Sequence, residues 1–589
     1  MRGEMTEMNL VSLARERASR DGDRIAYTYL DDGFAAPRSF SWRDLDERSR
    51  AMAVMLSHHC QPGDRALLVL PPGPDFLFAF LGCLYAGVVA VPAPVPARSR
   101  DIARLSGLHA DATPSAVVSA RGILEAGLAA AAGVPCLAAE EVSLGSAAGW
   151  EEPSIDAASL AFLQYTSGST GNPKGVMVSH ANILANEAMI SRSFGTDPAA
   201  TVVGWLPHFH DMGLIGNILQ PLFVGAHAVL ASPMAFMRDP LGWLRTISRY
   251  RGRSSGGPNF AYELCVRRHD RLGRKLDVDL SGWELAFVGA EPVRADTMRR
   301  FADTFAAYGF DERALFPCYG LAEATLFVTG GEKGIAPRTW GRESRPGVRS
   351  VFVGCGRAAA GLDVEIVNPE TRQVCPDGVE GEVLVRGPSV SSGYWNRPEE
   401  TRETFGQRVS GKDGSYLRTG DLAVRLDGEV YITGRIRDLI IIAGQNHYPQ
   451  DVEAIAEGVG SGVRPGNCAA FGFDTPEGER VGLVCEVNDL PCSPAALCAD
   501  IRAAVADGQS MRLDVIVLVE PRSLPKTTSG KIERRATGRA FLEGTLSAVA
   551  ASSLIASAEP WSEALARVRV DESARRDPAA AVRPSGVAV

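Results

Sequence analysis

The sequence predicts an α/β fold in which parallel β-sheets are covered by helices over most of the chain. Short apolar segments typical of buried strands alternate with helical segments through the first half of the sequence. Strands separated by helices of roughly ten or more residues are typical of βαβ units, which build parallel sheets. The expected strands of this kind are 65–71, 87–94, 114–120, 201–207, 226–232 and 283–290.

The second half of the chain has a different pattern. From residue 363 onward the expected strands are shorter and follow one another directly, which is typical of antiparallel hairpins. Asp427 and Gly428 lie between two such strands and predict a tight hairpin turn. A smaller α+β segment is expected after Gly434 and ends near residue 545. Residues 546–589 are rich in Ala, Ser and Arg without a clear period, and we expect a loosely ordered tail there.

The composition is that of a globular protein and excludes some functions. Of the 589 residues, 45% are hydrophobic and 22% are charged, so a sizeable core can form. The formal net charge of −9 argues against a nucleic-acid-binding protein, which needs a basic face. The eleven cysteines are scattered without a Cys-x-x-Cys pair, so reduced thiols are expected. The N-terminal residues do not resemble a signal peptide, and the expected location is cytoplasmic.

Residues 76–97 form an uncharged run that is long enough to span a bilayer. The alternative is a buried helix at 76–86 that turns at Gly87 into a buried strand, because both elements read as continuous apolar runs inside an α/β protein. Prolines at both ends of the run would break a membrane helix. We therefore expect a buried helix and strand, and not an integral membrane protein.

The segment YTSGSTGNPKGV at 165–176 is the clearest sign of function. Its glycines allow tight backbone turns, its hydroxyls donate hydrogen bonds, and Lys174 adds positive charge, which together suit a cradle for a polyphosphate. The spacing is not that of a Walker A loop. A flexible Ser/Gly linker is the alternative, but a linker does not usually end in Pro-Lys-Gly-Val directly before a helix start, here expected at Ser179.

This segment resembles the phosphate-binding signature of the adenylate-forming superfamily, which includes acyl-CoA synthetases, luciferases and nonribosomal adenylation domains. Five further segments resemble motifs of that superfamily, in its order: GAEPVR at 289–294, CYGLAEAT at 318–325, YLRTGDL at 416–422, GRIRDLIIIAGQNHYPQDVE at 434–453 and PKTTSGKIERR at 525–535. The resemblance implies a large N-terminal domain, 1–433, of stacked αβα sheets with a small β-barrel-like subdomain. A hinge at 434–438 and a small mobile α+β C-terminal domain at 439–545 would follow.

The resemblance also implies a binding site for ATP and Mg²⁺. Glu323 is expected to hold Mg²⁺ as a catalytic residue, Lys531 to bridge the substrate carboxylate and the α-phosphate, and Asp421 to accept the ribose hydroxyls. Arg437 and Asp438 match the hinge, and Lys526 is interpreted as a solvated surface lysine. The other expected nucleotide-binding residues are Thr166, Ser167, Gly168, Ser169, Thr170, Gly171, Lys174, Gly289, Ala290, Glu291, Tyr319, Gly320 and Arg435.

The segment GWLPHFHDMGLIGNILQPLFVG at 204–225 resembles fatty acyl-AMP ligases more than standard acyl-CoA synthetases. It is apolar and contains Gly213 and Gly216, which suits the wall of a tunnel for an acyl chain. Its polar exceptions are His210 and Asp211. Two hypotheses for His210 stay open: a catalytic role at the carboxylate end of the tunnel, or a satisfied His–Asp pair in the core.

The predicted function is ATP-dependent activation of a fatty acid to fatty acyl-AMP, with release of pyrophosphate. The acyl group would then pass to the phosphopantetheine thiol of an acyl carrier protein, or of a polyketide or nonribosomal synthase carrier domain acting in trans, in lipid, polyketide or lipopeptide biosynthesis. The stretch 329–352 is shorter than the insertion to which the family ascribes exclusion of CoA, so a fatty acyl-CoA ligase is the alternative. A non-catalytic adenylate-binding homologue is disfavoured by the retention of Glu323, Asp421 and Lys531.

Overall fold

The computed structural model describes residues 8–31, 33–96, 99–128, 132–166, 173–345, 348–442, 445–460, 462–475, 478–488, 493–509, 511–527, 531–554 and 569–570. These residues form two compact units. The first holds the described residues of Met1–Arg342 and Val351–Thr433, and the second those of Glu343–Ser350 and Gly434–Val589. The main division along the chain therefore falls between Thr433 and Gly434.

The first unit contains a six-stranded sheet with the order β6-β5-β3-β4-β7-β8. Every pair of neighbours is parallel except β7 and β8. All residues of β4 and β5 are buried, as expected for parallel strands covered on both faces. The strands are β3 (Arg65–Val69), β4 (Val89–Pro92), β5 (Ala116–Ser119), β6 (Cys136–Ala138), β7 (Leu160–Thr166) and β8 (Lys174–Ser179).

A nine-stranded sheet with the order β17-β14-β13-β12-β11-β9-β10-β1-β2 completes the α/β part of the first unit. Its six central strands, from β13 to β1, are parallel. Those strands are β13 (Leu315–Gly320), β12 (Leu285–Val288), β11 (Ser254–Gly257), β9 (Thr201–Gly204), β10 (His227–Ala231) and β1 (Ile25–Asp31). The antiparallel edges are β2 (Ala36–Ser41), β14 (Phe327–Gly330) and β17 (Arg357–Ala358).

Helices cover both sheets, and a single apolar core joins them. Phe80 of α3 packs edge-on against Phe162 of β7, with ring centroids 5.8 Å apart. The main helices are α1 (Leu10–Asp21), α2 (Trp42–Ser57), α3 (Pro74–Tyr85), α4 (Ser99–Ala112), α7 (His180–Phe194), α11 (Pro240–Tyr250), α12 (Asn259–Asp270) and α13 (Ala295–Phe305). Helix α7 begins at Ser179 with a capping box to Asn182, which confirms the helix start expected there.

The six strands expected from apolar runs are all present, as β3, β4, β5, β9, β10 and β12. Strand β11 was not predicted because its sequence, Ser-Ser-Gly-Gly, carries no apolar side chain, yet all four residues are buried. The glycines are required by close packing. A Cβ on Gly256 would lie 2.1 Å from the carbonyl oxygen of Phe287, and one on Gly257 would lie 2.8 Å from the Trp205 ring.

The uncharged run 76–97 folds as a buried helix and strand, as expected. Helix α3 is buried on all sides from Phe76 to Tyr85, and the chain turns at Gly87, with a positive φ of 68°, into β4. In the part of the chain that the structure describes, no helix has the length and apolarity to cross a membrane.

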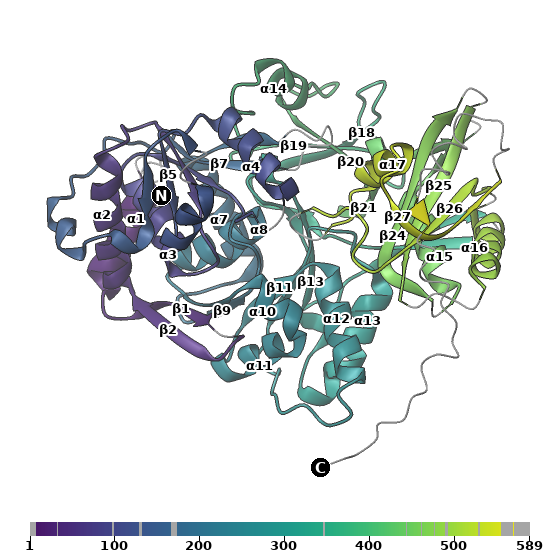
Figure 1. Cartoon of the computed structure of the whole chain (residues 1–589), viewed down its shortest axis with the longest axis horizontal. Helices are drawn as coiled ribbons and strands as arrows, with labels where there is room; N and C mark the ends of the chain where they lie inside the picture. The colour runs from purple at the N-terminus through teal and green to yellow at the C-terminus, as the bar shows by residue number, and fades with distance from the viewer. Residues whose placement is uncertain are drawn as a thin grey trace, which may run out of the picture. The chain divides into compact units, whose positions relative to one another are not determined.

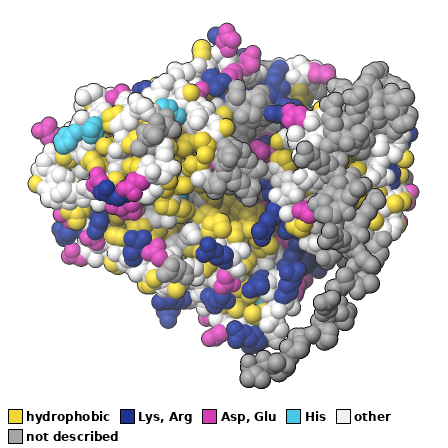
Figure 2. All heavy atoms as spheres, viewed as in Figure 1, with side chains coloured by type: hydrophobic (Ala, Val, Ile, Leu, Met, Phe, Trp, Pro, Cys, Tyr) yellow, Lys and Arg dark blue, Asp and Glu magenta, His cyan; other side chains and the backbone are white. Residues whose placement is uncertain are grey.

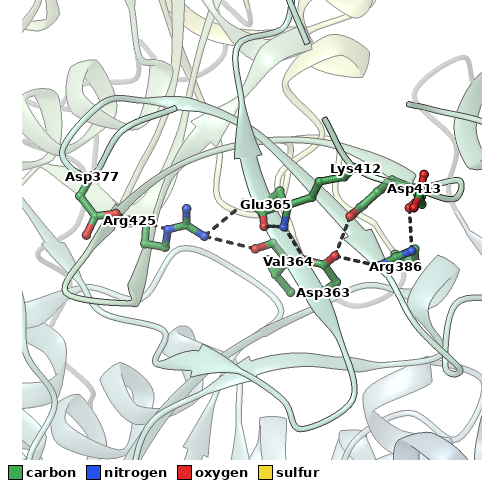
Figure 3. A network of polar contacts seen from close by, with 9 residues as sticks. Asp363, Val364, Glu365, Asp377, Arg386, Lys412, Asp413 and Arg425 are labelled. Atoms are coloured by element: carbon green, nitrogen blue, oxygen red, sulfur yellow. Dashed lines mark hydrogen bonds and ion pairs between the residues drawn. The ribbon is translucent and has the colours of Figure 1, made fainter. Parts of the chain in front are cut away.

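A four-stranded sheet, β18-β19-β20-β21, forms the subdomain that ends the first unit. Its strands are β18 (Asp363–Val367), β19 (Gly381–Arg386), β20 (Leu417–Leu426) and β21 (Glu429–Arg435). Asp427 and Gly428 form the β20–β21 turn with φ of 51° and 79°, which confirms the hairpin expected at that pair. Figure 3 shows a chain of ion pairs across this sheet, in which Arg425 and Lys412 both reach the buried Glu365.

The second unit is a three-layer sandwich around the sheet β24-β25-β26-β27-β28 (Figure 1). One face packs against α15 and α16, and the other against α17. Consecutive residues of β24 alternate between the two cores, with Ala470 in one and Phe471 in the other. The elements are α15 (Pro449–Gly458), α16 (Pro494–Gln509), α17 (Arg534–Leu542), β24 (Val463–Thr475), β25 (Gly478–Val487), β26 (Val515–Val519), β27 (Ser547–Ser553) and β28 (Arg569–Val570); a separate ribbon joins β22 (Ile440–Ile442) and β23 (Gln445–His447).

Strand β27 lies beyond residue 545, where the sequence analysis expected a loosely ordered tail. Residues 547–553 pair antiparallel with β26 and complete the sheet of the second unit. The pairing was not predicted because small residues, Ala and Ser, make a weak strand signal. Most of the remaining tail, at 555–568 and 571–589, lies outside the described residues.

We expect Phe541→Ala to destabilise the second unit by about 3–5 kcal/mol, because it leaves a cavity at a fully buried aromatic position. The Phe541 ring lies 5.8 Å from that of Phe471 and 5.4 Å from that of Phe473. Urea unfolding followed by fluorescence measures the change. Arg539→Ala, at an exposed position of the same helix, is the control and should shift the transition by less than about 0.5 kcal/mol.

Candidate active site

The polyphosphate segment joins the ends of an antiparallel strand pair. Thr166 ends β7 and lies opposite Lys174, which begins β8. The residues between them that the sequence analysis selected, namely Ser167, Gly168, Ser169, Thr170 and Gly171, lie outside the described residues. The structure therefore fixes both stems of the loop, and β8 runs directly into the capped start of α7.

The expected site residues follow the carboxyl ends of neighbouring parallel strands. In the nine-stranded sheet, β9, β11, β12 and β13 are adjacent. His210 follows β9, Gly289–Glu291 follow β12, and Glu323 follows β13. Ligands of α/β sheets bind beyond the carboxyl ends of the strands. The topology thus gathers segments that are more than a hundred residues apart in the sequence at one edge of the sheet.

Lys174 and Glu323 both contact Tyr394, which the sequence analysis did not select. The Tyr394 hydroxyl donates a hydrogen bond of 2.8 Å to Oε1 of Glu323. The Lys174 ammonium lies 5.0 Å from the centroid of the same ring. Burial, together with the Glu323 carboxylate, raises the pKa of Tyr394, so the phenol stays protonated and remains a donor. One tyrosine therefore stands between the expected phosphate cation and the expected metal ligand.

Lys174 also forms an ion pair with Glu400, at the start of α14 (Pro398–Phe405). The hydrogen bond from Lys174 lowers the pKa of the Glu400 carboxyl. The Lys174 side chain is 15% exposed, so its charge is held in a restricted position. Glu400 was missed because a glutamate in the first turn of a helix is usually a solvated residue that favours the helix dipole.

The backbone around Tyr394 explains its position. Val176 of β8 and Tyr394 form an isolated antiparallel bridge, and the Trp395 N–H donates to the carbonyl of Gly175 at 2.8 Å. Gly393 takes a φ of 141°, and a Cβ there would lie 2.2 Å from Thr401. The sequence signal for this position is the Gly-Tyr-Trp run before a helix that starts at a proline. The role of that run becomes clear only from its pairing with β8.

A third missed residue, Asn186 of α7, anchors the turn that carries Glu323. Its Oδ1 accepts the Phe327 N–H at 3.0 Å, and its Nδ2 donates to the Phe327 carbonyl at 2.9 Å. Within the turn, Thr325 takes a φ of 70°, which costs a non-glycine residue about 1 kcal/mol or more. The Thr325 hydroxyl donates to the Ser389 carbonyl at 2.6 Å and compensates in part. Helix α7, which follows the polyphosphate segment and β8, and the turn that carries Glu323 are thus fixed to each other.

Tyr319 and Asp421, expected at the adenine and the ribose, lie together. The Tyr319 hydroxyl donates to Oδ2 of Asp421 at 2.7 Å, although the residues are 102 positions apart. Asp421 is 4% exposed and its N–H donates to the Thr419 hydroxyl at 3.1 Å. Gly320 next to Tyr319 has no room for a side chain, since a Cβ would lie 1.8 Å from the Leu326 carbonyl oxygen.

The turn Gly289–Glu291 is packed closely onto β13. A Cβ on Gly289 would lie 3.0 Å from Cys318 Sγ, and Ala290 takes a φ of 68°, which is uncommon for a residue with a Cβ. Oε1 of Glu291 accepts the N–H of Phe260 at 2.6 Å, in the first turn of α12. Glu291 therefore stabilises the start of a helix, a contact that the sequence analysis did not foresee.

His210 and Asp211 form a pair at the start of the apolar segment. Nδ1 of His210 lies 2.6 Å from Oδ1 of Asp211, and the two side chains are 23% and 13% exposed, so the pair lies at the edge of the core. The buried histidine of this segment is His208. Burial lowers its pKa to about 3, so its ring is neutral. The apolar segment is hydrogen-bonded to β7, the strand that precedes the polyphosphate loop, since Gln164 Nε2 donates to the Phe209 carbonyl at 2.9 Å.

Apolar side chains dominate the surface beside this segment. Figure 2 shows hydrophobic side chains gathered in a hollow near the centre of the view, over the region where Figure 1 labels α10 (Pro233–Arg238) and β11. Met234 and Met237 of α10 are 59% and 53% exposed. Phe236, also of α10, is buried and stacks on Trp205 with ring centroids 3.8 Å apart. A broad apolar surface of this kind suits a hydrocarbon ligand.

Lys531 and Arg435 belong to the second unit. Lys531 closes a short hairpin: its N–H donates to the Thr527 hydroxyl at 3.0 Å, and its carbonyl accepts the Thr527 N–H at 2.8 Å. Lys526 is no solvated lysine, because its Nζ donates to Oδ1 of Asn467 at 2.6 Å. Arg435 is exposed at the end of β21.

The site residues fit a nucleotide that carries its own metal ion. Mg²⁺ takes hard oxygen ligands and is usually held by one or two carboxylates together with substrate phosphates. Glu323 supplies a carboxylate that Tyr394 orients, and the cation Lys174 stands on the other side of the same ring. The carboxylate and the cation on one tyrosine are therefore compatible with a metal ion and phosphates bound together.

Comparison with known proteins identifies the class. A family model described as AMP-binding enzyme matches residues 14–395. A second model, described as the AMP domain of Disco-interacting protein 2-like proteins, matches residues 437–551. The chain belongs to the AMP-binding enzyme family.

Individual relatives match over nearly the whole chain. It is 40% identical to the medium-chain-fatty-acid–[acyl-carrier-protein] ligase JamA of Moorena producens over 91% of this chain and 95% of that protein. It is 36% identical to the putative fatty-acid–CoA ligase FadD21 of Mycobacterium tuberculosis, over 90% and 97% of the two chains. Among solved structures, a fatty acyl-adenylate ligase from L. pneumophila in complex with acyl adenylate and pyrophosphate has a TM-score of 0.73 and 38% identity. That match covers 93% of this chain and 98% of the other.

We expect Tyr394→Phe to weaken binding of Mg·ATP about ten-fold, because a hydrogen bond to a charged group contributes roughly 1.5–3 kcal/mol and Glu323 loses the donor that orients it. The phenylalanine ring keeps the contact with Lys174. Isothermal titration calorimetry measures the affinity.

Tyr416→Phe is the matched control, since Tyr416 also donates to a carboxylate, Asp363, but within the four-stranded sheet. That variant should bind Mg·ATP as the wild type does. Equal affinity of Tyr394→Phe and the wild type would show that Tyr394 does not position Glu323.

Proposed function

We propose that this protein is a fatty acyl-AMP ligase. It activates a fatty acid with ATP to fatty acyl-AMP, releases pyrophosphate, and then transfers the acyl group to the phosphopantetheine thiol of an acyl carrier protein. The observation that carries the proposal is that two groups of contacts occur in the first unit. Lys174 and Glu323 both contact Tyr394, and Tyr319 contacts Asp421. The first suits phosphates with a metal ion, and the second suits a nucleoside.

In the first step, a carboxylate oxygen attacks the α-phosphorus of ATP, and the bond from that phosphorus to the pyrophosphate oxygen breaks. Both reactants are anions, so fixed cations and dipoles must stabilise the transition state. Lys174 and the hydroxyls and N–H groups of Thr166 and the loop after it receive the phosphates. Mg²⁺ bound at Glu323 supplies further positive charge. Lys531 is assigned to the carboxylate and the α-phosphate.

The nucleoside is assigned to the other half of the site. Tyr319 and the turn of Gly289, Ala290 and Glu291 provide a surface for adenine, beside Gly320, which packs directly on the Leu326 carbonyl. Asp421 accepts the ribose hydroxyls, and Arg435 reaches the ribose or a phosphate. His210 is assigned to the carboxylate end of the acyl site, since its partly exposed pair with Asp211 follows β9 at the same edge of the sheet.

The acid is assigned as a fatty acid because of the apolar surface over α10 and β11. A hydrocarbon chain gains about 0.8 kcal/mol for each buried methylene group. The names of JamA and of the acyl-adenylate complex agree with this class. The name of JamA, an acyl-carrier-protein ligase, favours a carrier protein as the acyl acceptor. A cytoplasmic location and a place in lipid, polyketide or lipopeptide biosynthesis are part of the proposal.

Free CoA is the second candidate acceptor. FadD21, which matches over 90% of this chain, is named as a putative fatty-acid–CoA ligase. A competition assay decides between the two acceptors. The protein, ATP, Mg²⁺ and a mixture of medium- and long-chain fatty acids are incubated with either CoA or a phosphopantetheinylated carrier protein, and the products are identified by mass spectrometry.

We expect acyl-AMP and pyrophosphate in every reaction, and acyl transfer to the carrier at a rate at least about ten-fold above that to CoA, a difference of roughly 1.4 kcal/mol in activation free energy. Acyl-CoA formed as fast as acyl-carrier would reject the carrier assignment. Absence of pyrophosphate with every fatty acid would reject the activation step and favour a non-catalytic adenylate-binding protein.

We expect Lys531→Ala to abolish adenylation, with a loss of at least about 10³-fold, because a single cation bridges both reacting anions. Transfer of the acyl group from chemically prepared acyl-AMP to the carrier should remain close to wild type. Fatty-acid-dependent ATP–pyrophosphate exchange measures the first step, and the second is measured separately. Lys412→Ala, at a lysine that pairs with Glu365 of the four-stranded sheet, is the control. Equal loss in both steps would contradict the role of Lys531.

A further inference from the structure

Two adjacent arginines that follow Lys531 contact the hinge. Arg534 begins α17 and Arg535 is its second residue. Nη1 of Arg534 lies 3.3 Å from Oδ2 of Asp438, and Nη2 of Arg535 donates to the Arg437 carbonyl at 3.0 Å. Arg437 and Asp438 are the two residues that the sequence analysis placed at the hinge. The segment that carries the catalytic lysine is therefore bonded directly to the hinge, although 96 residues separate Asp438 from Arg534.

The same guanidinium is fixed from the other side by Glu453 of α15. Nε and Nη2 of Arg534 donate to the two carboxylate oxygens of Glu453 at 2.6 Å and 2.7 Å. A two-point contact of this kind fixes the plane of the guanidinium as well as its position. Oε1 of Glu453 also accepts the N–H of Ala470 in β24 at 3.0 Å. Arg534 thus joins the hinge, α15, β24 and α17 at one point.

The hairpin of Lys531 is equally well fixed to the sheet. Lys526 and Ile532 form an antiparallel bridge, and the Glu533 N–H donates to the Pro525 carbonyl at 3.0 Å. Just before the hairpin, the Leu524 N–H donates to the buried Glu486 at 3.2 Å. Since only two residues separate Lys531 from Arg534, a displacement of the α17 start moves the lysine.

We propose that Arg534 is a positioning residue that holds Asp438 and the Lys531 hairpin in one rigid piece. This inference rests on the proposed function. Rotation at the hinge then takes place before Asp438 and is transmitted in full to Lys531. The described residues from Gly434 onward, hinge included, belong to the second unit, as this proposal requires.

The competing explanation is that Arg534 forms a purely structural ion pair. The two hypotheses can be distinguished because Arg534 binds two carboxylates, Asp438 and Glu453, whose contacts can be removed separately. Removal of Arg534 leaves Glu453, which is 3% exposed, without its cation and weakens the fold. Asp438→Ala removes only the hinge contact and leaves the Arg534–Glu453 pair intact. Asp438→Ala is therefore the informative variant, and Arg534→Lys, which keeps the charge and loses the two-point geometry, is the second.

The test measures ATP–pyrophosphate exchange with a fatty acid for the wild type, Asp438→Ala, Arg534→Lys and the double variant. We expect each single variant to lower kcat of adenylation about ten-fold, the size expected for one hydrogen bond between charged groups, with the KM for ATP changed by less than about two-fold. The double variant should be no slower than the slower single variant, because both changes break the same contact. Arg512→Lys, at an exposed arginine that pairs with the buried Asp514, is the matched control and should retain full activity.

Hydrogen exchange provides a readout that does not depend on the reaction. In Asp438→Ala, amide exchange should increase about ten-fold or more at 436–438 and at Thr527 and Lys531, with no change in the β24–β26 sheet. Faster exchange together with an inactive wild type would reject the proposed function and keep the positioning role. Full adenylation by Asp438→Ala, losses that multiply in the double variant, or exchange that increases throughout the second unit would each overturn the proposal.

Discussion

Separation of opposite charges is the constraint on which the candidate site depends. A site for ATP and Mg²⁺ needs a cation for the phosphates and a carboxylate for the metal ion, yet such a pair placed in direct contact would neutralise itself. Tyr394 prevents this, since its ring lies against Lys174 and its hydroxyl binds Glu323. Lys174 is paired with Glu400 instead. Phosphate bound at the proposed site would replace Glu400 as the anion beside Lys174, so that Lys174 need not be desolvated without a partner.

The parallel topology of the nine-stranded sheet explains why candidate residues remote in sequence lie at one edge of that sheet. Loops at the carboxyl ends of adjacent strands share one edge of a sheet, so His210, Glu291 and Glu323 come together through strand order alone. Fine positioning comes from other contacts. Asn186 fixes the Glu323 turn to α7, and Tyr394 joins it to β8 by a backbone bridge. Strand order thus brings the groups near one another, and side chains remote in sequence set the final geometry.

Much of this fold follows from the sequence, because apolar runs and tight turns are local signals. The six buried strands, the helix start at Ser179 and the turn at Asp427 were all predicted from a few neighbouring residues. The pairing of Tyr319 with Asp421 was not, although both residues were selected, since a contact across 102 positions has no local signal. Strand β11 and residues Tyr394 and Glu400 were missed for the same reason. Their roles depend on close backbone packing and on partners elsewhere in the chain.

The second unit has a different physical requirement, which is that the proposed catalytic lysine must be placed accurately after the domain rotates. A lysine that must reach two reacting anions tolerates little displacement, because a small misplacement of a catalytic group costs a large factor in rate. A loosely attached hairpin would lose that accuracy at every rotation. The buried network around Glu453 avoids this loss, since it bonds the hinge end, the sheet and the start of α17 to one guanidinium. Flexibility can then be confined to the short backbone before Asp438. A mobile domain can place its lysine precisely only when the end of the hinge, at Asp438, belongs to the rigid part of that domain.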